Sequence, residues 1–269
     1  MSVTRLVASA VICVAVAAPV SADVTLRMTM VESAFDGRVT SVTEYRKGLK
    51  MRTDSSGAAI ASNSVILNLE TGLVIMLWHD GKSADVIDFR RMASPLGKNE
   101  VTQSITPTTQ SRQIAGSTCT VYNVRSAVRM AERMIEMAEP IAIVIEGSMC
   151  LAKNAPGQAD FARLSRAMAE RAVPVPDPQS AIQREIAELG VPYATELTVS
   201  LGANVPGAEM HKIGTHTTEV SSVSTTPIPD SMFDPCGLQG DPTISHAEWL
   251  YLRSNSAPDK RGRLIWHVP

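Results

Sequence analysis

Alternating apolar and polar residues in the first half of the chain predict short β-strands with one buried face. From Val24 to Met30 every second residue is apolar, and the residues between them are Thr or Arg. Successive side chains of a strand point to opposite faces of a sheet, so this period of two is typical of a half-buried strand. The same pattern recurs in further segments, at 38–46, 49–53, 65–69 and 83–89, and residues 73–78 form a continuous apolar run.

Glycine-containing turn signals separate these segments. They are Asp36-Gly37, Lys47-Gly48, Thr71-Gly72 and Asp80-Gly81. Glycine accepts the positive φ that tight hairpin turns require. Short strands joined by such turns predict an antiparallel meander.

Strand-like segments return in the second half of the chain. They are Ile114–Val124, with Gly116 indicating a bulge or turn near its start, Ile141–Leu151, and segments near Ala194–Leu201 and Glu209–Val223. The polar residues 94–111 predict a loop or a weak strand. Residues 127–139 have high helix propensity but lie between two apparent strands, so a helical excursion and a long hairpin remain open.

Two helices are expected between these strands. Gln158–Val173 carries Phe161, Leu164 and Met168 at spacings of three and four residues, which is one helical face. A second helix is expected at 177–189, because Asp177 is a suitable N-cap and Gly190 a suitable C-terminal stop.

The predicted fold is α+β and mainly β. One large antiparallel sheet with two covering helices occupies residues 23–240, and 241–269 form an irregular tail. Several apolar residues in this tail, among them Trp249, Leu264, Ile265 and Trp266, indicate that it docks somewhere on the domain.

The first 22 residues have the pattern of a secretory signal peptide. Arg5 supplies a basic start, Leu6–Val20 an apolar core, and Val20-Ser21-Ala22 a small-residue cleavage site. We therefore expect cleavage after Ala22 and a periplasmic or secreted protein.

A membrane anchor and a lipoprotein anchor fit this start less well than a signal peptide. The apolar run of 15 residues is short of the roughly 20 that a membrane-spanning helix needs. A lipoprotein anchor needs a cysteine at the cleavage point, whereas Cys13 follows Ile12 inside the apolar core. No transmembrane segment is expected after cleavage.

Charge excludes one class of partner. The chain has 25 basic and 27 acidic residues, and loss of Arg5 leaves 24 and 27, a net charge of −3 with His neutral. Nucleic-acid binding requires a clear basic excess. We expect no nucleic-acid partner, and no attraction to an anionic membrane surface.

Cleavage also leaves three cysteines, of which one must remain unpaired within the chain. Cys119 and Cys150 lie in strand-like segments that neighbouring strands would bring within bridging reach, so we predict a disulfide between them. Three free thiols, or a pairing that uses Cys236, remain alternatives.

Several stretches of the chain carry a resemblance to a known group of proteins. They are Glu44–Asp54, Ile66–Leu77 leading into Ile87–Phe89, Ile114–Val124, Cys150–Glu170 and the close Pro227–Gly237. Together they resemble a family of uncharacterised bacterial exported proteins similar in fold to the lipoprotein-localisation carriers LolA and LolB. The resemblance implies a curved half-barrel sheet with helices on its concave side, and it brings no catalytic residues. The close at 234–236 and the tail beyond 240 depart from the family pattern.

The sequence carries no recognisable catalytic or metal-binding motif. C-x-x-C, H-x-x-x-H and G-x-S-x-G are absent. His211 and His216 are five residues apart in a predicted strand, which predicts opposite faces and poor joint metal ligands. We therefore predict no catalytic, cofactor or metal residues, no cofactor, and a protein that is not an enzyme.

Methionine is frequent where aromatic residues are scarce, with 13 Met in the chain. Flexible, polarisable methionines suit an apolar pocket for a lipid or acyl chain. The predicted lining comes from the sheet and the first helix: Met28, Met30, Met51, Leu67, Met76, Phe161, Leu164 and Met168. The sequence thus favours an exported protein that binds an apolar ligand or a lipidated partner. The alternative is a structural or interaction module of the cell envelope, in which these residues simply fill the core.

Overall fold

The computed structural model describes residues 23–33, 37–57, 63–78, 83–88, 100–130, 139–170, 185–205, 207–234 and 263–267. Its strands are β1 (Val24–Glu32), β2 (Arg38–Lys47), β3 (Lys50–Gly57), β4 (Asn63–Asn68), β5 (Leu73–Trp78), β6 (Ser83–Asp88), β7 (Glu100–Ile114), β8 (Ser117–Arg129), β9 (Ile141–Ala152), β10 (Val191–Ala203), β11 (His211–Ser224) and β12 (Arg263–His267). Its helices are α1 (Gln158–Glu170), a helical turn at 185–189, and the 3₁₀ helix η2 (Asp230–Phe233).

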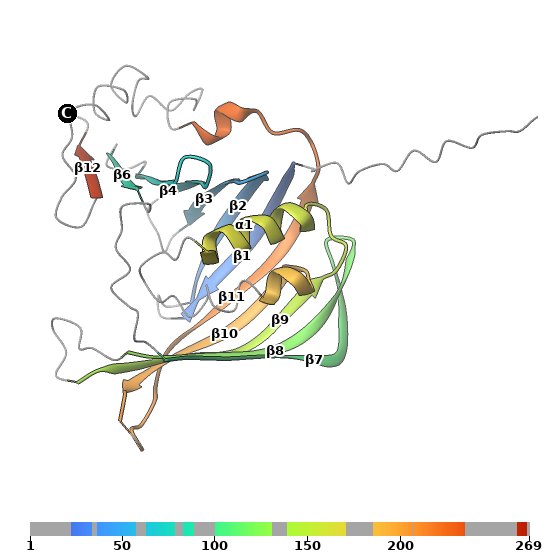
Figure 1. The fold of residues 1–269 in the computed structure, drawn as a ribbon. Helices are drawn as coiled ribbons and strands as arrows, with labels where there is room; N and C mark the ends of the chain where they lie inside the picture. The colour runs from blue at the N-terminus through green and yellow to red at the C-terminus, as the bar shows by residue number, and fades with distance from the viewer. Residues whose placement is uncertain are drawn as a thin grey trace, which may run out of the picture.

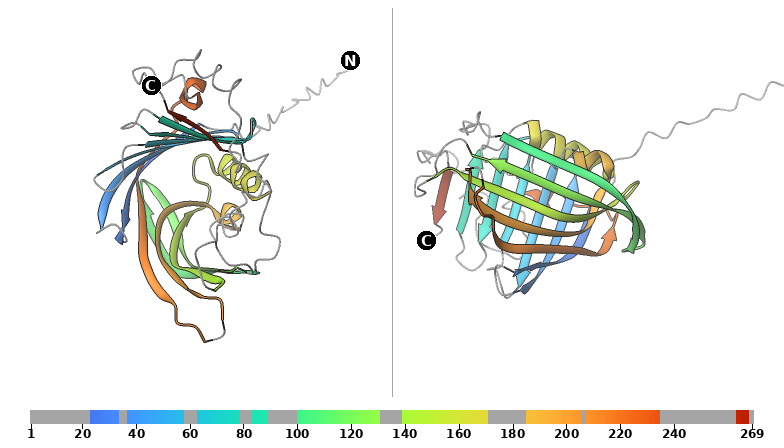
Figure 2. Two further views of the ribbon diagram at one scale, coloured as in Figure 1. Left: turned by 90° about the vertical axis from the view of Figure 1, so that its left-hand side faces the viewer. Right: turned by 90° about the horizontal axis from the view of Figure 1, so that it is seen from below.

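The strands form one antiparallel sheet of two meanders. Within the described residues it has 12 strands in the order β12-β6-β5-β4-β3-β2-β1-β11-β10-β9-β8-β7. The meander β1–β6 and the meander β7–β11 meet where β1 pairs with β11. The sheet is strongly curved, and α1 and the turn at 185–189 lie on its concave side (Figures 1 and 2). The predicted mainly β, antiparallel class is confirmed.

The predicted turns within the described residues are confirmed. Gly48 and Gly72 have φ values of 57° and 73° in the turns after β2 and β4. Gly116 (φ 80°) and Ala115 (φ 47°) form the two-residue turn between β7 and β8. Asp80-Gly81 lies outside the described residues.

Two segments left open by the sequence are strands as far as they are described. Residues 100–114 form β7, which pairs only with β8 and lies at the edge of the sheet. Most of its side chains are exposed, and this explains their polarity. Ala127–Arg129 form the end of β8, so the helical reading is wrong for these residues, and 131–138 lie outside the described residues.

The helix α1 covers the concave face of the first meander. Its Leu164 and Met168 pack with Leu67, Leu69 and Met51 of the sheet in a filled cluster. The helix is described to Glu170 rather than to the predicted Val173. Of the second predicted helix only its last turn at 185–189 is described.

The opposite, convex face of the same meander is also covered. Ile228, just before η2, and Phe233, the last residue of η2, pack on a row of sheet residues: Ile66, Ile75, Leu77 and Val86. Polar contacts fix this segment, since Lys47 donates to the Ile228 carbonyl (2.7 Å) and Arg52 to the Met232 carbonyl (3.2 Å). Because Ile66 and Leu67 point to opposite faces, β4 is apolar on both sides.

The tail requires one correction. The sequence predicts an irregular segment at 241–269, but Arg263–His267 form β12, which pairs with β6 at the edge of the sheet. The short apolar run Leu264-Ile265-Trp266 provides β-propensity for this strand. The other residues of 241–269 lie outside the described residues, and so does Cys236.

A disulfide joins Cys119 of β8 to Cys150 of β9, as predicted, with a Cα–Cα distance of 5.3 Å. Both cysteines are buried in a cluster with Ile114, Ala152 and Val220. The β7–β8 hairpin bends over to bring this cluster together, and Arg112 of β7 reaches Glu219 of β11 at 2.6 Å.

No helix in the described part of the chain has the length and apolar character needed to cross a membrane. The expected signal peptide, residues 1–22, lies outside the described residues.

Candidate functional site

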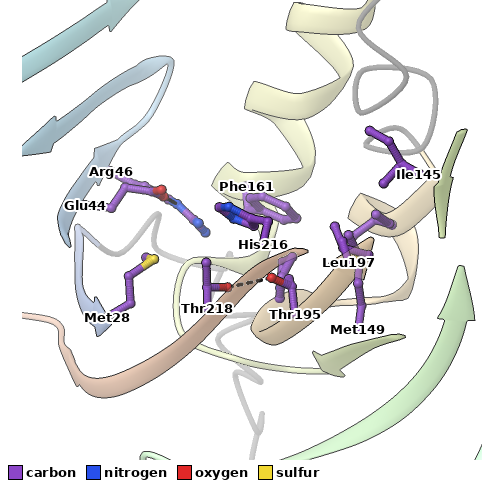
Figure 3. A pocket seen from close by; sticks show the side chains of 12 residues that line it. Met28, Glu44, Arg46, Ile145, Met149, Phe161, Thr195, Leu197, His216 and Thr218 are labelled. Atoms are coloured by element: carbon purple, nitrogen blue, oxygen red, sulfur yellow. Dashed lines mark hydrogen bonds and ion pairs between the residues drawn. The ribbon is translucent and has the colours of Figure 1, made fainter. Parts of the chain in front are cut away.

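An unfilled cavity of about 280 Å³ lies between the concave face of the sheet and the helices. Its walls come from both meanders and from both helical segments (Figure 3). The lining residues are Met28, Glu44, Arg46, Ile145, Met149, Phe161, Ile186, Pro192, Thr195, Leu197, His216 and Thr218.

Strand alternation places these side chains on one face. In β2, Glu44 and Arg46 are two residues apart, so both point the same way as the paired residue Leu26 of β1. Across the second meander, Leu197 of β10 pairs with His216 of β11. The cavity therefore spans the seam where the two meanders join.

The helices complete the apolar part of the wall. Phe161 from the first turn of α1 and Ile186 from the turn at 185–189 both reach the cavity. They pack in one cluster with Ile145, Met149 and Leu197 of the sheet. One end of the cavity is thus formed by aliphatic and aromatic carbon.

Arg46 forms the polar end. It is only 6% exposed, and its guanidinium lies over the Phe161 ring at 4.5 Å from the centroid. Its Nε–H donates to Glu44 Oε1. Its Nη1 is buried and has no hydrogen-bond partner among the residues that the structure describes. A buried unpaired donor is costly.

Two further polar contacts line the cavity. The hydroxyls of Thr195 and Thr218 are 2.8 Å apart across β10 and β11. Only one hydroxyl hydrogen is used in that bond, because one group donates and the other accepts. His216 Nδ1 lies 3.1 Å from Glu32 Oε1.

Of the eight residues predicted to line a pocket, two line the cavity and six lie elsewhere. Met28 and Phe161 line the cavity. Met51, Leu67, Leu164 and Met168 pack together in the filled cluster under α1. The other two, Met30 and Met76, are partly buried and lie outside the lining.

Sequence reasoning missed the polar lining residues Arg46, Glu44 and His216. A signal existed in β2, where Val42, Glu44 and Arg46 alternate. Two charged residues on the face that continues from Val42 indicate charge directed toward the interior. The threonines carry no such signal, because Thr is common on both faces of strands.

The two histidines of β11 also require a correction. Ile213 is an extra residue in the β10–β11 pairing, so His211 pairs with Leu201 and returns to the face of His216. His211 is exposed. Across the described ranges, no three His, Cys, Asp or Glu side chains gather as a metal site requires.

A larger cavity of about 450 Å³ on the convex face is a weaker candidate. Its charged residues are exposed and already paired, Arg125 with Glu146 at 3.3 Å and Arg129 with Glu100 at 3.7 Å. The cavity on the concave face combines apolar walls with an unpaired buried donor, and we take it as the candidate site.

Comparison of the sequence with models of known protein families gives no match. Comparison with curated proteins gives no match either.

Proposed function

We propose that this chain is an exported binding protein that holds an apolar ligand in the cavity on its concave face. The observation that carries the proposal is the cavity itself, about 280 Å³ and unfilled between the sheet and the helices. Apolar walls with a few convergent polar groups are the usual composition of a small-molecule site.

The size of the cavity limits the ligand. Small-molecule sites span about 300–1,000 Å³, so this cavity of about 280 Å³ lies just below that range. It suits a single acyl chain better than a lipid with several chains. The neighbouring space under α1 is occupied by Leu164, Met168 and their sheet partners.

Two further observations support the proposal. The resemblance to exported proteins of the LolA and LolB type points to a carrier for lipid or a lipidated partner. The buried disulfide between Cys119 and Cys150 suits an oxidising compartment, such as the periplasm or the exterior of the cell.

Native mass spectrometry of the protein purified from its own compartment tests the proposal directly. We expect a population whose extra mass corresponds to one bound lipid. A clean unliganded mass under gentle ionisation would count against a ligand-binding function.

A pair of neighbouring variants in β1 tests the cavity as the site. Met28 lines it, whereas Thr29 is exposed on the other face. We expect Met28→Trp to fill the cavity and weaken binding of a fluorescent acyl probe about tenfold or more, which corresponds to roughly 1.4 kcal/mol. Thr29→Trp is the matched control and should bind the probe normally. Equal binding by both variants would place the ligand elsewhere.

The filled cluster of Met51, Leu67 and Leu164 favours a second candidate, a structural or interaction module of the cell envelope. If the protein is such a module, the cavity of about 280 Å³ on the concave face is only a packing defect. The module predicts no bound lipid and no probe binding, so the same two measurements separate the candidates.

A further inference from the structure

We infer that the cavity selects an uncharged ligand with a hydroxyl group, whose O–H donates a hydrogen bond to Nε2 of His216. The inference rests on the proposed function and adds the chemistry of the ligand. Long-chain aliphatic alcohols and other neutral single-chain lipids with a terminal hydroxyl have this chemistry.

The contact between His216 and Glu32 determines which ring nitrogen carries the hydrogen. Nδ1 of His216 lies 3.1 Å from Oε1 of Glu32. An ionised carboxylate can only accept a hydrogen bond, so Nδ1–H is the donor in this contact. In a neutral imidazole only one nitrogen carries a hydrogen, and the other nitrogen accepts. Nε2 of His216 is therefore an acceptor, and its partner must be a donor.

Nε2 of His216 can be reached by a ligand. The His216 side chain lines the cavity and is 28% exposed. Glu32 is not part of the lining, so its contact with Nδ1 leaves the cavity side of the ring open. Nε2 makes no hydrogen bond to the described residues, and it is not one of the inaccessible polar atoms that lack a partner. The acceptor is thus both accessible and unused.

The apolar wall of the cavity begins directly beside this acceptor. Leu197 of β10 pairs with His216 of β11. Leu197 packs in one cluster with Ile145, Met149 and Ile186, and all four residues line the cavity (Figure 3). A hydroxyl group at Nε2 therefore places the hydrocarbon chain along Leu197 toward Ile145 and Met149.

The charges near His216 disfavour an anionic ligand. Glu32 contacts the ring, and Glu44 lines the same cavity beside its ion-pair partner Arg46. Arg46 thus balances only one of the two carboxylates. A ligand carboxylate at Nε2 would meet a lone pair instead of a donor, and it would add a third negative charge where water is scarce. A hydroxyl group supplies the donor without a charge to bury.

Three matched ligands test the inference on the chain that begins at Asp23. Calorimetric titration is carried out at about pH 8.5, where an ordinary imidazole is uncharged. Decanol and nonyl methyl ether have the same number of heavy atoms, but only decanol has an O–H, and decanoate has a carboxylate in its place. We expect decanol to bind about tenfold more tightly than the ether, and decanoate to bind more weakly than decanol.

The possible outcomes separate this inference from the proposed function. Binding of the ether as tight as that of decanol or tighter, or tightest binding of decanoate, would overturn the inference and leave the proposed function intact. A chain that binds the fluorescent acyl probe but none of the three ligands would do the same. If the probe and all three ligands fail to bind, the proposed function fails and this inference with it.

A single variant assigns the preference to the imidazole. His216→Phe keeps a planar ring and removes both nitrogens. We expect the ratio of decanol to ether affinity to fall to about one, with near-normal ether binding. His211→Phe, at an exposed position of the same strand, is the matched control and should leave the ratio unchanged. An unchanged ratio in His216→Phe contradicts the assignment. The comparison of ligands on the unmodified chain does not depend on the folding of any variant.

Discussion

Gly147 of β9 lies opposite β10 next to the cavity. It has a φ of 154°, and a Cβ at this position would lie 2.0 Å from the Glu196 carbonyl oxygen. It pairs with Leu197, whose side chain lines the cavity. Glycine is therefore the residue that lets β10 lie close enough to bring Leu197 to the wall.

We expect Gly147→Ala to destabilise the fold by about 1–3 kcal/mol, because both the backbone angle and the contact with Glu196 oppose a side chain. The midpoint of urea unfolding measures this loss. Ser148→Ala in the same strand is the control, with a much smaller shift expected. Identical midpoints for the two variants would contradict the close approach.

The disulfide allows a second prediction at this scale. Cys119 and Cys150 are separated by 31 residues. On the chain-entropy model, a cross-link that closes a loop of this length raises the free energy of the unfolded chain by about 3–4 kcal/mol. The double variant Cys119→Ala with Cys150→Ala should lose about this much free energy of unfolding. Cys236→Ala is the control and should lose little.

Thiol counting tests the same pairing without a variant. The unfolded, unreduced mature chain should contain one free thiol. Three free thiols would refute the disulfide.

Part of the cavity lining was predictable from the sequence. The alternation of apolar and polar residues in β1, and the helical spacing of apolar residues in α1, were enough to predict that Met28 and Phe161 point toward the interior. The unpaired donor on Arg46 was not predictable, because it depends on how the guanidinium lies against Glu44 of the same strand and Phe161 of α1. Whether a methionine fills a core or lines a cavity depends on how near the helix lies, which periodicity does not encode.

At the scale of elements, the segment 228–234 acts as a cover on the convex face. Phe233 is buried against Ile66, Ile75 and Leu77. Asp23 at the start of β1 accepts a hydrogen bond from the Ile228 amide at 2.7 Å and lies 3.7 Å from Lys47. The cover is therefore held both by apolar contact and by partly buried polar groups.

We expect Phe233→Ala to cost about 3 kcal/mol or somewhat less, since removal of a buried aromatic ring leaves a cavity. The loss should be local, with faster amide hydrogen exchange in β4 and β5 and little change in β9 and β10. Ser231→Ala, at an exposed position of the same 3₁₀ helix, should leave exchange unchanged. Uniform acceleration across the whole sheet would argue against a local cover.

Elements were predictable where their own sequence determines them. The strands of the first meander follow from a period of two and from turns with glycine at positive φ, and α1 follows from one apolar stripe. β7 was ambiguous because an exposed edge strand has no buried face to mark it. β12 was missed because its pairing with β6 joins residues that are far apart in the chain, and no local pattern in the tail reports such a contact.

At the scale of the molecule, the pairing of β1 with β11 unites the two meanders. Thr25 pairs with Ser224 and Glu32 with His216, along the whole length of β1. The candidate cavity spans this seam, with Met28 on one side and Thr218 on the other. The two meanders therefore share one site, and neither contains it alone.

Truncation tests this dependence. A chain that ends at Asn204 lacks β11 and η2, so β1 and β10 each lose a neighbour. We expect it to lose the cooperative thermal transition seen by circular dichroism. A chain that ends at Asp234 keeps the seam and loses only β12 among the described strands, and it should still unfold cooperatively. A sharp transition in the shorter chain would show that the first meander is stable without the seam.

The pairing of β1 with β11 also has a consequence for the newly made chain, because β1 is synthesised long before its partner β11. β2 follows β1 directly in the sequence, whereas β11, the partner of the other edge of β1, follows only after β10. Until then the first meander presents an open strand edge, which is a template for association with other chains. Contacts between such distant segments also fold slowly, because the long intervening loop must close first. We therefore expect a chaperone that shields the free edge of β1 until β11 has been made to reduce such association.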